Sequence, residues 1–341
     1  MLNSNEKFVS VIIPCRNEEK FIGKCLDSLV TQDYPKDKLE IFVLNGISVD
    51  KTKEIVREYN KKYPFIKILD NPNKTSPYAL NIGIKNSTGE LIMHMGAHTI
   101  YQLDYVSKSV KYLIEYNADN VGGVLRTLPS INTLMAKAIT LVLSNKFGTG
   151  NAFFRIGSDK PIWVDTVFGG CYKKEMLIKV GGYNEKLTRS QDMEMNMRLK
   201  KIGAKMLLAP DIVSYYYPKA TFKAFFKHNI SDGIWAIYPL KFGAPIFSVR
   251  HLAPLAFILV FVITAIFGIF FKIFLWLLLL ELVVYFGTSK IISIRIAKKE
   301  KKLILTPYLV TAFFARHFGY GIGSFIGLIK LILPAKSKNN L

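Results

Sequence analysis

The stretch Val9-Ser-Val-Ile-Ile-Pro-Cys-Arg-Asn-Glu18 decides the fold, and Ile41-Phe-Val-Leu-Asn-Gly-Ile-Ser-Val-Asp50 repeats its pattern. Each is an apolar, β-branched run that ends abruptly in polar, turn-forming residues. Such runs are typical of parallel strands buried on both faces, whose carboxyl ends carry side chains toward a ligand crevice. We therefore expect the chemistry of this protein at the ends of these strands.

The segments that follow alternate between helical and strand patterns. The apolar positions of 19–32 share one helical face, and helices are also predicted over 51–63, 77–86 and 104–116. Strands are predicted over 66–69 and 90–95. This βαβαβαβ order predicts an α/β fold with a mostly parallel, doubly wound sheet and right-handed crossovers.

The composition changes near His251, beyond which the chain is largely apolar. Residues 252–271 carry no charge and have about the length that a helix needs to cross a ~30 Å hydrocarbon core. Residues 273–289 would return as the second arm of a hairpin, and 303–333 form a third apolar stretch interrupted by Arg316 and His317. This third stretch is either a spanning helix or a bent helix in the interface. We expect a catalytic domain over 1–220, an interfacial amphipathic segment over 221–250 and a membrane region over 251–341 with two to three transmembrane helices.

The net charge of +21 and its distribution suit a membrane protein better than a nucleic-acid binder. A dense basic cluster over 295–302 lies between the second and third apolar stretches, so the positive-inside rule predicts a multi-pass chain with this cluster and the N-terminal half on the cytoplasmic side. No nucleic-acid recognition motif is present, and the polar N-terminus lacks a signal-peptide pattern. Cys15, Cys25 and Cys171 have no metal-ligand spacing, which predicts reduced core thiols.

Eight segments in a fixed order resemble the motifs of one enzyme family. They are VSVIIPCRNEE, NGISVD, NPNKTSPYALNIGI, GELIMHMGAHTIY, SNKFGTGNAFFR, VDTVFGGCYKKE, VGGYNEKL and SQDMEMNMRL, and the resemblance covers about residues 8–243. Their joint order and spacing resemble family 2 glycosyltransferases of the GT-A fold, and in particular the enzymes of succinoglycan-type exopolysaccharide synthesis. The resemblance implies an inverting transfer of a sugar from a nucleotide-diphosphate donor, in many members to a polyprenyl-phosphate-linked acceptor at the membrane.

The resemblance also implies which residues bind the donor. Asn45 stands where the family usually has an aspartate that accepts a base N–H; an asparagine can both accept and donate, so the preferred base can differ. Asp50 matches the last acid of the same motif, and it also suits a cap of the helix that follows. Lys74 either approaches the nucleotide or is a solvated surface lysine. The full predicted donor set is Pro14, Arg16, Asn17, Glu18, Asn45, Asp50, Lys74, Gly96 and His98.

The place of the family's metal-binding Asp-x-Asp motif reads Gly96-Ala97-His98 here. Gly96 removes the leading carboxylate, and His98 aligns with the residue that usually touches the metal. A divalent cation, Mg²⁺ or Mn²⁺, is therefore uncertain; an imidazole suits Mn²⁺ better than Mg²⁺. Arg155 could supply positive charge to the phosphates instead, or be an ordinary surface arginine.

Asp192 in Ser190-Gln-Asp-Met-Glu194 matches the family's catalytic base, which removes the proton of the attacking hydroxyl. An aspartate at the start of a helix is also a common cap. Glu194 is the nearest rival and could orient the acceptor or phosphate. Gly169 and Gly170 would let the backbone approach donor or acceptor closely.

Three functions remain open at this point. The first is a membrane-attached glycosyltransferase with a lipid-linked or glycan acceptor, whose lipid phosphate Arg250, Arg316 and the 298–302 cluster could neutralise. The second is a polyprenyl-phosphate monosaccharide synthase, and the third is a non-catalytic scaffold, motivated by Asn45 and Gly96. Segments 134–143 and 222–238 suit either interfacial helices or core helices. The missing Gln-x-x-Arg-Trp-like run favours single addition over polymerisation, and the oligomeric state is not readable from the sequence.

Overall fold

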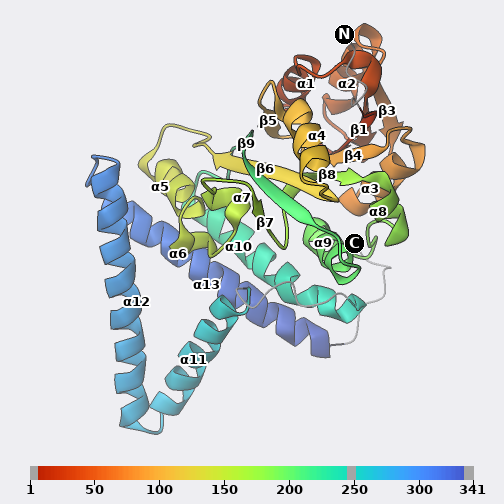
Figure 1. Ribbon diagram of the computed structural model, residues 1–341. Coiled ribbons are helices and arrows are strands. Elements are labelled where there is room, and N and C mark those ends of the chain that lie inside the picture. Colours follow the sequence, from red (N-terminus) through yellow and green to blue (C-terminus); the bar gives the residue numbers. More distant parts are fainter. Residues whose placement is uncertain (1–6, 244–250, 334–341) are drawn as a thin grey trace. The chain divides into compact units, whose positions relative to one another are not determined.

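The computed structural model describes residues 7–243 and 251–333 (Figure 1). They divide into two compact units. Unit 1 comprises the chain up to residue 126 together with 152–217, and unit 2 comprises 127–151 together with the chain from 218 onward. Residues 127–151 thus fall inside the predicted 1–220 domain by sequence but pack within unit 2. The predicted interfacial segment 221–250 and membrane region 251–341 stay predictions, and Arg250 lies outside the described residues.

Unit 1 is built on a mixed sheet whose first half is parallel, as predicted. The order of these strands is β3 (Ile66–Asp70), β2 (Leu39–Asn45), β1 (Val9–Cys15) and β4 (Leu91–His94). Strands β1 and β2 are buried almost throughout, which explains their continuous apolar runs. Their carboxyl ends lie at one edge of the sheet, with Cys15 beside Asn45 and Asn45 beside Asp70.

The second half of the sheet is antiparallel, and the sequence pattern did not reveal it. Strand β8 (Phe168–Lys173) pairs antiparallel with both β4 and β6 (Asn120–Thr127). The sheet continues through β9 (Met206–Tyr216), which pairs antiparallel with β5 (Thr99–Tyr101) and β7 (Ile162–Trp163). Because β8 lies next to β4, the chain around Gly169 reaches the ends of the parallel strands.

Helices cover the sheet close to the predicted positions. The main ones are α1 (Ile22–Val30), α2 (Thr52–Lys62), α3 (Ser76–Asn86), α4 (Tyr105–Glu115) and α9 (Gln191–Lys201). Shorter turns are η1 (Lys36–Lys38), α7 (Phe153–Ile156) and α8 (Lys174–Lys179). Two apolar cores form, one containing α1 and α4 and the other containing α3 and α9. All three cysteines are buried and free, as predicted, and burial raises the pKa of Cys25 and of Cys171 to about 12.

Unit 2 is helical, and its core is the third apolar stretch of the sequence. Its elements are α5 (Leu134–Leu143), α6 (Lys146–Thr149), α10 (Phe222–Ile237), η2 (Tyr238–Phe242), α11 (Ala253–Gly268), α12 (Lys272–Lys299) and α13 (Leu305–Ile332). Helix α13 packs against α10, α5, α11 and α12 and buries twelve residues. Arg316 and His317 therefore face protein, which removes the cost of two basic side chains in hydrocarbon. Helices α5 and α10 each bury one face in this core.

Glycines allow α13 to approach α10 closely. Gly319, Gly323 and Gly327 recur every fourth residue and so lie on one face of α13. A Cβ atom added at Gly323 would lie 2.0 Å from the backbone oxygen of Ile230 on α10. Small residues at this spacing let two helix backbones come into contact.

Substitution of Gly323 by alanine is expected to destabilise unit 2. The added methyl group meets backbone rather than a flexible side chain, so the helices must separate, at a cost of about 1–3 kcal/mol. Gly287→Ala on α12 is the matched control, because its added Cβ has no neighbour within 4 Å. Thermal unfolding in detergent should show a lower Tm for Gly323→Ala alone, and equal Tm values for both variants would contradict this account of the packing.

Helices α11 and α12 form the predicted hairpin (Figure 1). Both expose many apolar side chains. Among the described residues, one helix is long and apolar enough to cross a membrane, namely α12, which is 28 residues long. Helix α11 has 16 residues, and α13 is largely packed inside unit 2. The two to three spanning helices expected from the sequence are thus represented by one candidate.

Candidate functional site

A pocket of about 310 Å³ lies at the carboxyl ends of the parallel strands of unit 1. Its walls come from the segments after β1, β3 and β4, from the start of β8 and from the start of α9. Eleven further lining residues were not predicted as site residues, among them Asn71, His94, Phe168 and Gln191. The pocket brings together Pro14, Arg16, Glu18, Lys74, Gly96, His98, Gly169 and Asp192 from the predicted set.

Close backbone contacts bring the loops after β1, β2 and β3 together. The Gly46 amide donates to the Cys15 carbonyl oxygen at 2.8 Å. A Cβ atom at Gly46 would lie 3.1 Å from the Lys74 carbonyl oxygen and 3.2 Å from Cβ of Arg16. The small residue that follows β2 therefore allows two basic residues from different loops to reach the same pocket.

Three predicted donor-binding residues, Asn17, Asn45 and Asp50, do not line the pocket but hold its loops. The Asn17 amide donates to Ser48 Oγ at 3.0 Å, and its Oδ1 accepts from the Val49 amide at 3.0 Å. Asn45 is buried, accepts from the Ser48 amide at 3.2 Å and donates to Asp70 at 3.2 Å. These hydrogen bonds join the loops after β1 and β2, and contact of Asn17, Asn45 and Asp50 with the donor stays a prediction.

Asp50 has the capping role that the sequence left open. Its Oδ1 accepts from the amide of Thr52, the first residue of α2, at 3.1 Å, and its Oδ2 accepts from the Glu19 amide at 3.2 Å. These hydrogen bonds lower the pKa of Asp50. The Asp50 carboxylate stays ionised and joins the loop after β2 to the loop after β1.

Arg16 and Lys74 supply positive charge to the pocket. Both are exposed, and within the described residues neither has a carboxylate in ion-pair distance. Lys74 has a left-handed φ of 63°, in a loop that Asn71 closes by donating from its side chain to the Thr75 carbonyl oxygen at 2.9 Å. Two uncompensated cations in one concave site suit a phosphate-bearing ligand.

His98 and Glu18 are in contact in the pocket wall, with 3.3 Å between His98 Nδ1 and Glu18 Oε1. Gly96 turns the chain beside them, and its amide donates to the Tyr101 hydroxyl at 2.7 Å. No group of three His, Cys, Asp or Glu side chains within the described residues could hold a metal ion. An imidazole and a carboxylate give only two protein donors, so a cation here would need the ligand's own oxygens to complete its coordination shell.

Asp192 lines the pocket from the start of α9, as the predicted catalytic base requires. Ser190, at a left-handed φ of 58°, precedes the helix, which begins at Gln191, so Asp192 is its second residue. Its Oδ1 accepts from the Met193 amide at 2.9 Å. Burial nevertheless raises the pKa of Asp192 above its ordinary value, because desolvation outweighs this hydrogen bond. A carboxylate with a raised pKa is a stronger proton acceptor.

Glu194 lies outside the pocket. It is buried, and its two oxygens accept from Arg198 at 2.7 and 2.8 Å. Arg198 also donates to the carbonyl oxygens of Val180 and Gly182, so the pair fastens α9 to the turn after α8. Glu194 thus positions α9 through its ion pair with Arg198. Asp192 is the carboxylate at the start of α9 that faces the pocket.

Arg155, Gly170 and Gly169 differ in their placement. Arg155 lies 5.5 Å from the Tyr216 ring, whose centroid is 5.8 Å from that of His98, and it does not line the pocket. Gly170 packs inward, since its Cβ would lie 2.0 Å from Asn120 Oδ1. Gly169 lines the pocket at a φ of 64°, a conformation that favours glycine.

His94 is a pocket residue that the sequence reasoning missed. It is the last residue of β4, and its ring lies edge-on to Tyr183 at a centroid distance of 6.1 Å. Burial lowers the pKa of His94 to about 4, so the imidazole is neutral near pH 7. The feature of the sequence that could have identified His94 as a site residue is its place at the end of an otherwise apolar strand.

The amino-acid sequence matches glycosyl transferase family 2 over residues 10–177. One relative is 30% identical over 95% of this chain and 98% of its own length: a dolichyl N-acetyl-alpha-D-glucosaminyl phosphate 3-beta-D-2,3-diacetamido-2,3-dideoxy-beta-D-glucuronosyltransferase from Methanococcus voltae. Another, the succinoglycan biosynthesis protein ExoA of Rhizobium meliloti (strain 1021), is 26% identical over 71% of this chain and 79% of its own length.

The fold also resembles that of a solved enzyme. A mannosyltransferase from Pyrobaculum calidifontis, in complex with GDP-Man and Mn²⁺, aligns with a TM-score of 0.60 at 18% identity, over 96% of this chain and 88% of the other. The matched motifs, the mixed sheet and the pocket at its strand ends define a GT-A-like glycosyltransferase. The chain belongs to glycosyl transferase family 2.

Proposed function

We propose that this glycosyltransferase moves a sugar, with inversion, from a nucleotide-diphosphate donor to a lipid-linked or glycan acceptor, with Asp192 as the base. The observation that carries the proposal is the shared pocket: a half-buried carboxylate and two uncompensated cations line the same cavity at the strand ends. A sugar diphosphate needs the cations, and an attacking alcohol needs the carboxylate.

In the proposed reaction, Arg16 and Lys74 bind the diphosphate. The acceptor oxygen attacks the anomeric carbon from the face opposite the leaving group, so the new C–O bond forms as the bond to the diphosphate breaks. The hydroxyl proton passes to a carboxylate oxygen of Asp192. The nucleoside diphosphate leaves with the bonding electron pair, and the two cations stabilise its added charge.

A lipid-linked acceptor is supported by one relative and by the helical hairpin. The Methanococcus voltae relative carries a dolichyl phosphate acceptor in its name. We propose that the hairpin of α11 and α12 inserts into the membrane, with the basic 295–302 segment on the cytoplasmic side, because its apolar side chains are exposed and the basic residues follow directly after them. In a multi-pass arrangement, α11 would have to cross the membrane as well as α12.

A divalent cation fits the pocket if the donor contributes to its coordination. His98 and Glu18 would hold it together with diphosphate oxygens, and a mixed nitrogen and oxygen donor set suits Mn²⁺ better than Mg²⁺. When bound, such a cation would neutralise charge on the leaving diphosphate.

His98→Ala is expected to weaken Mn²⁺ binding at least about tenfold when a nucleoside diphosphate is present. Titration calorimetry of Mn²⁺ into the protein measures this directly. The control is Tyr215→Phe, which removes a hydroxyl that bonds to Gln102 and does not line the pocket. Transfer should stop in a chelator and recover with Mn²⁺ more fully than with Mg²⁺. Full activity in the chelator would show that Arg16 and Lys74 neutralise the diphosphate without a metal.

The proposed function is tested by supplying the detergent-solubilised protein with a panel of nucleotide sugars and acceptors. Mass analysis of the lipid products separates a sugar added to an existing lipid-linked saccharide from one placed on a bare polyprenyl phosphate. The first product supports the proposal, and the second would assign the chain as a polyprenyl-phosphate monosaccharide synthase. No product with any donor and acceptor would favour a non-catalytic scaffold.

A further inference from the structure

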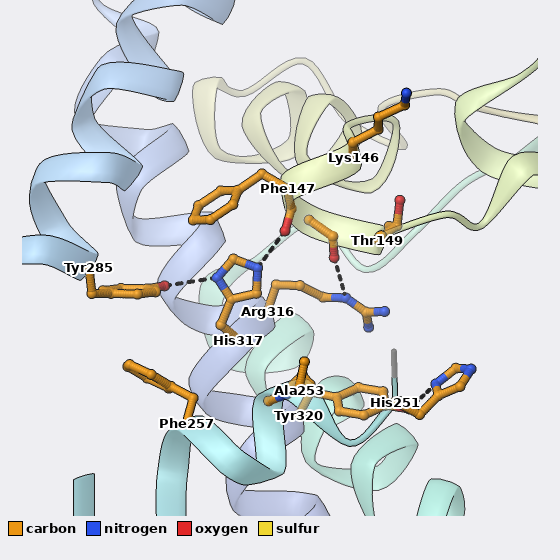
Figure 2. A pocket seen from close by; sticks show the side chains of 13 residues that line it. Lys146, Phe147, Thr149, His251, Ala253, Phe257, Tyr285, Arg316, His317 and Tyr320 are labelled. Carbon is orange, nitrogen blue, oxygen red and sulfur yellow. Dashed lines mark hydrogen bonds between the residues drawn. The ribbon is translucent and has the colours of Figure 1, made fainter. Parts of the chain in front are cut away.

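Unit 2 contains a second pocket, of about 380 Å³, that the transfer reaction above does not use (Figure 2). Its walls come from α6 and the residues after it, from the beginning of α11, from the middle of α12 and from α13. Most of the lining is aromatic or aliphatic, and it includes Phe147, Pro254, Phe257, Tyr285 and Tyr320.

Arg316 of α13 places a positive charge in this apolar surrounding. Its Nε donates to the Gly148 carbonyl oxygen at 3.0 Å, and its Nη1 donates to Asn229 Oδ1 at 2.5 Å. The carboxylate of Asp232 is 3.8 Å away, beyond hydrogen-bond distance, and so compensates the charge only in part. Figure 2 shows the guanidinium directed into the space below Thr149.

The neighbouring His317 fixes the wall opposite the charge. Its Nε2 donates to the Phe147 carbonyl oxygen at 2.7 Å, so its Nδ1 accepts from the Tyr285 hydroxyl at 3.0 Å. Burial lowers the pKa of His317 to about 4, which keeps the ring neutral and this arrangement of protons stable. Arg316 and His317 together hold two successive carbonyl groups of α6, and the pocket is therefore preformed.

The apolar wall is continuous with the exposed hairpin. Ala253, Pro254 and Phe257 belong to the first turns of α11, and Tyr285 belongs to α12. Beyond the pocket both helices expose apolar side chains to the surroundings, among them Val260, Ile263 and Val283. A ligand with an anionic head and a long hydrocarbon chain would match the guanidinium and the hairpin at the same time, whereas a soluble anion would use the guanidinium alone.

We propose that this pocket binds the phosphate of an isoprenoid-phosphate lipid, with the isoprenoid chain lying along α11 and α12. The choice of an isoprenoid over a common phospholipid rests on the proposed function, in which the acceptor is carried by such a lipid. The Arg316 guanidinium is the phosphate ligand, and Thr149 and His251 also line the pocket.

The test measures lipid binding directly and needs neither donor nor transfer. Farnesyl phosphate is titrated into the full-length protein in detergent, with inorganic phosphate and phosphatidylglycerol as the other two ligands. We expect farnesyl phosphate to bind more tightly than both. Arg316→Gln should raise its Kd about tenfold or more, and Arg316→Lys should recover part of the loss. Equal affinity for inorganic phosphate would show a simple anion site, and equal affinity for phosphatidylglycerol would show a general lipid surface; either result overturns the proposal.

Two further variants separate a binding effect from a folding effect. Arg295→Gln removes the same kind of charge from an exposed position of α12 and should leave the Kd unchanged. Ala253→Trp fills the mouth of the pocket from an exposed residue, so it should abolish farnesyl phosphate binding without lowering the Tm. Unchanged binding in Ala253→Trp would contradict the site. Because no sugar is transferred in this assay, loss of lipid binding and failure of the catalytic proposal are distinguishable.

Discussion

Asp192→Asn should lower kcat by about 10²–10⁴-fold, since it removes the proposed proton acceptor and leaves the pocket's cations in place. The structure predicts that the fold survives, because an asparagine Oδ1 can keep the hydrogen bond from the Met193 amide. Release of nucleoside diphosphate in the presence of acceptor measures the loss. Donor affinity should change little, because Arg16 and Lys74 remain.

The matched control is Asp159→Asn, which alters an exposed aspartate of unit 1 that does not line the pocket. It should retain most of its turnover. If Asp192→Asn and wild type release the product at equal rates, Asp192 is not the base.

The raised pKa of Asp192 gives this prediction a pH dependence. The reaction needs the ionised carboxylate, so kcat/KM of the wild type should fall as the pH drops through a value above the ordinary pKa of aspartate. Stability has the opposite dependence: the folded state binds this proton more tightly than the unfolded state, so the free energy of unfolding decreases as the pH rises through the same range. Asp192→Asn, which buries no charge, should therefore unfold at a higher temperature than wild type at neutral pH.

The sequence predicted the parallel half of the sheet because β1 and β2, at its centre, are buried, largely apolar runs that end in polar residues. The antiparallel half escaped prediction for two reasons. Strands β5 and β7 have three and two residues and leave almost no periodic signal. The longer strands β6, β8 and β9 are interrupted by paired glycines or by Pro210, which weaken a strand pattern. Similarly, the apolar composition of 303–333 could not distinguish a membrane helix from the core of a helical unit. That distinction depends on which helices pack around Arg316 and His317.

The candidate site was predictable where a motif places a side chain in the pocket, as at Asp192 and Lys74. It was not predictable where a polar residue either contacts the ligand or holds a loop. Asn17, Asn45 and Glu194 are polar residues of the types that often contact ligands. In the structure, Asn17 bonds to Val49, Asn45 to Ser48 and Glu194 to Arg198. Only the three-dimensional partner of each group shows which of the two roles it has.

Replacing both Arg16 and Lys74 by glutamine should lower kcat/KM by about 10²-fold or more. The two cations come from different loops but line one pocket, and they would stabilise the charge that develops on the departing diphosphate. Because both side chains are exposed, salt already screens part of this effect, and the wild-type rate should decline with ionic strength more steeply than that of the double variant.

A double-mutant cycle shows whether the two residues act on one group. The quantity compared is the loss of transition-state stabilisation, calculated from kcat/KM. If both residues contact the same diphosphate, the loss in the double variant should differ from the sum of the losses in the two single variants. Equality of the two within error would mean that the residues act independently. Lys20→Gln is the control, since it removes an exposed charge that follows the same strand but does not line the pocket. The double variant and Lys20→Gln could instead show the same donor KM and the same kcat. That result would remove Arg16 and Lys74 from the proposed diphosphate site. A metal ion at His98 and Glu18 would then be the remaining source of positive charge.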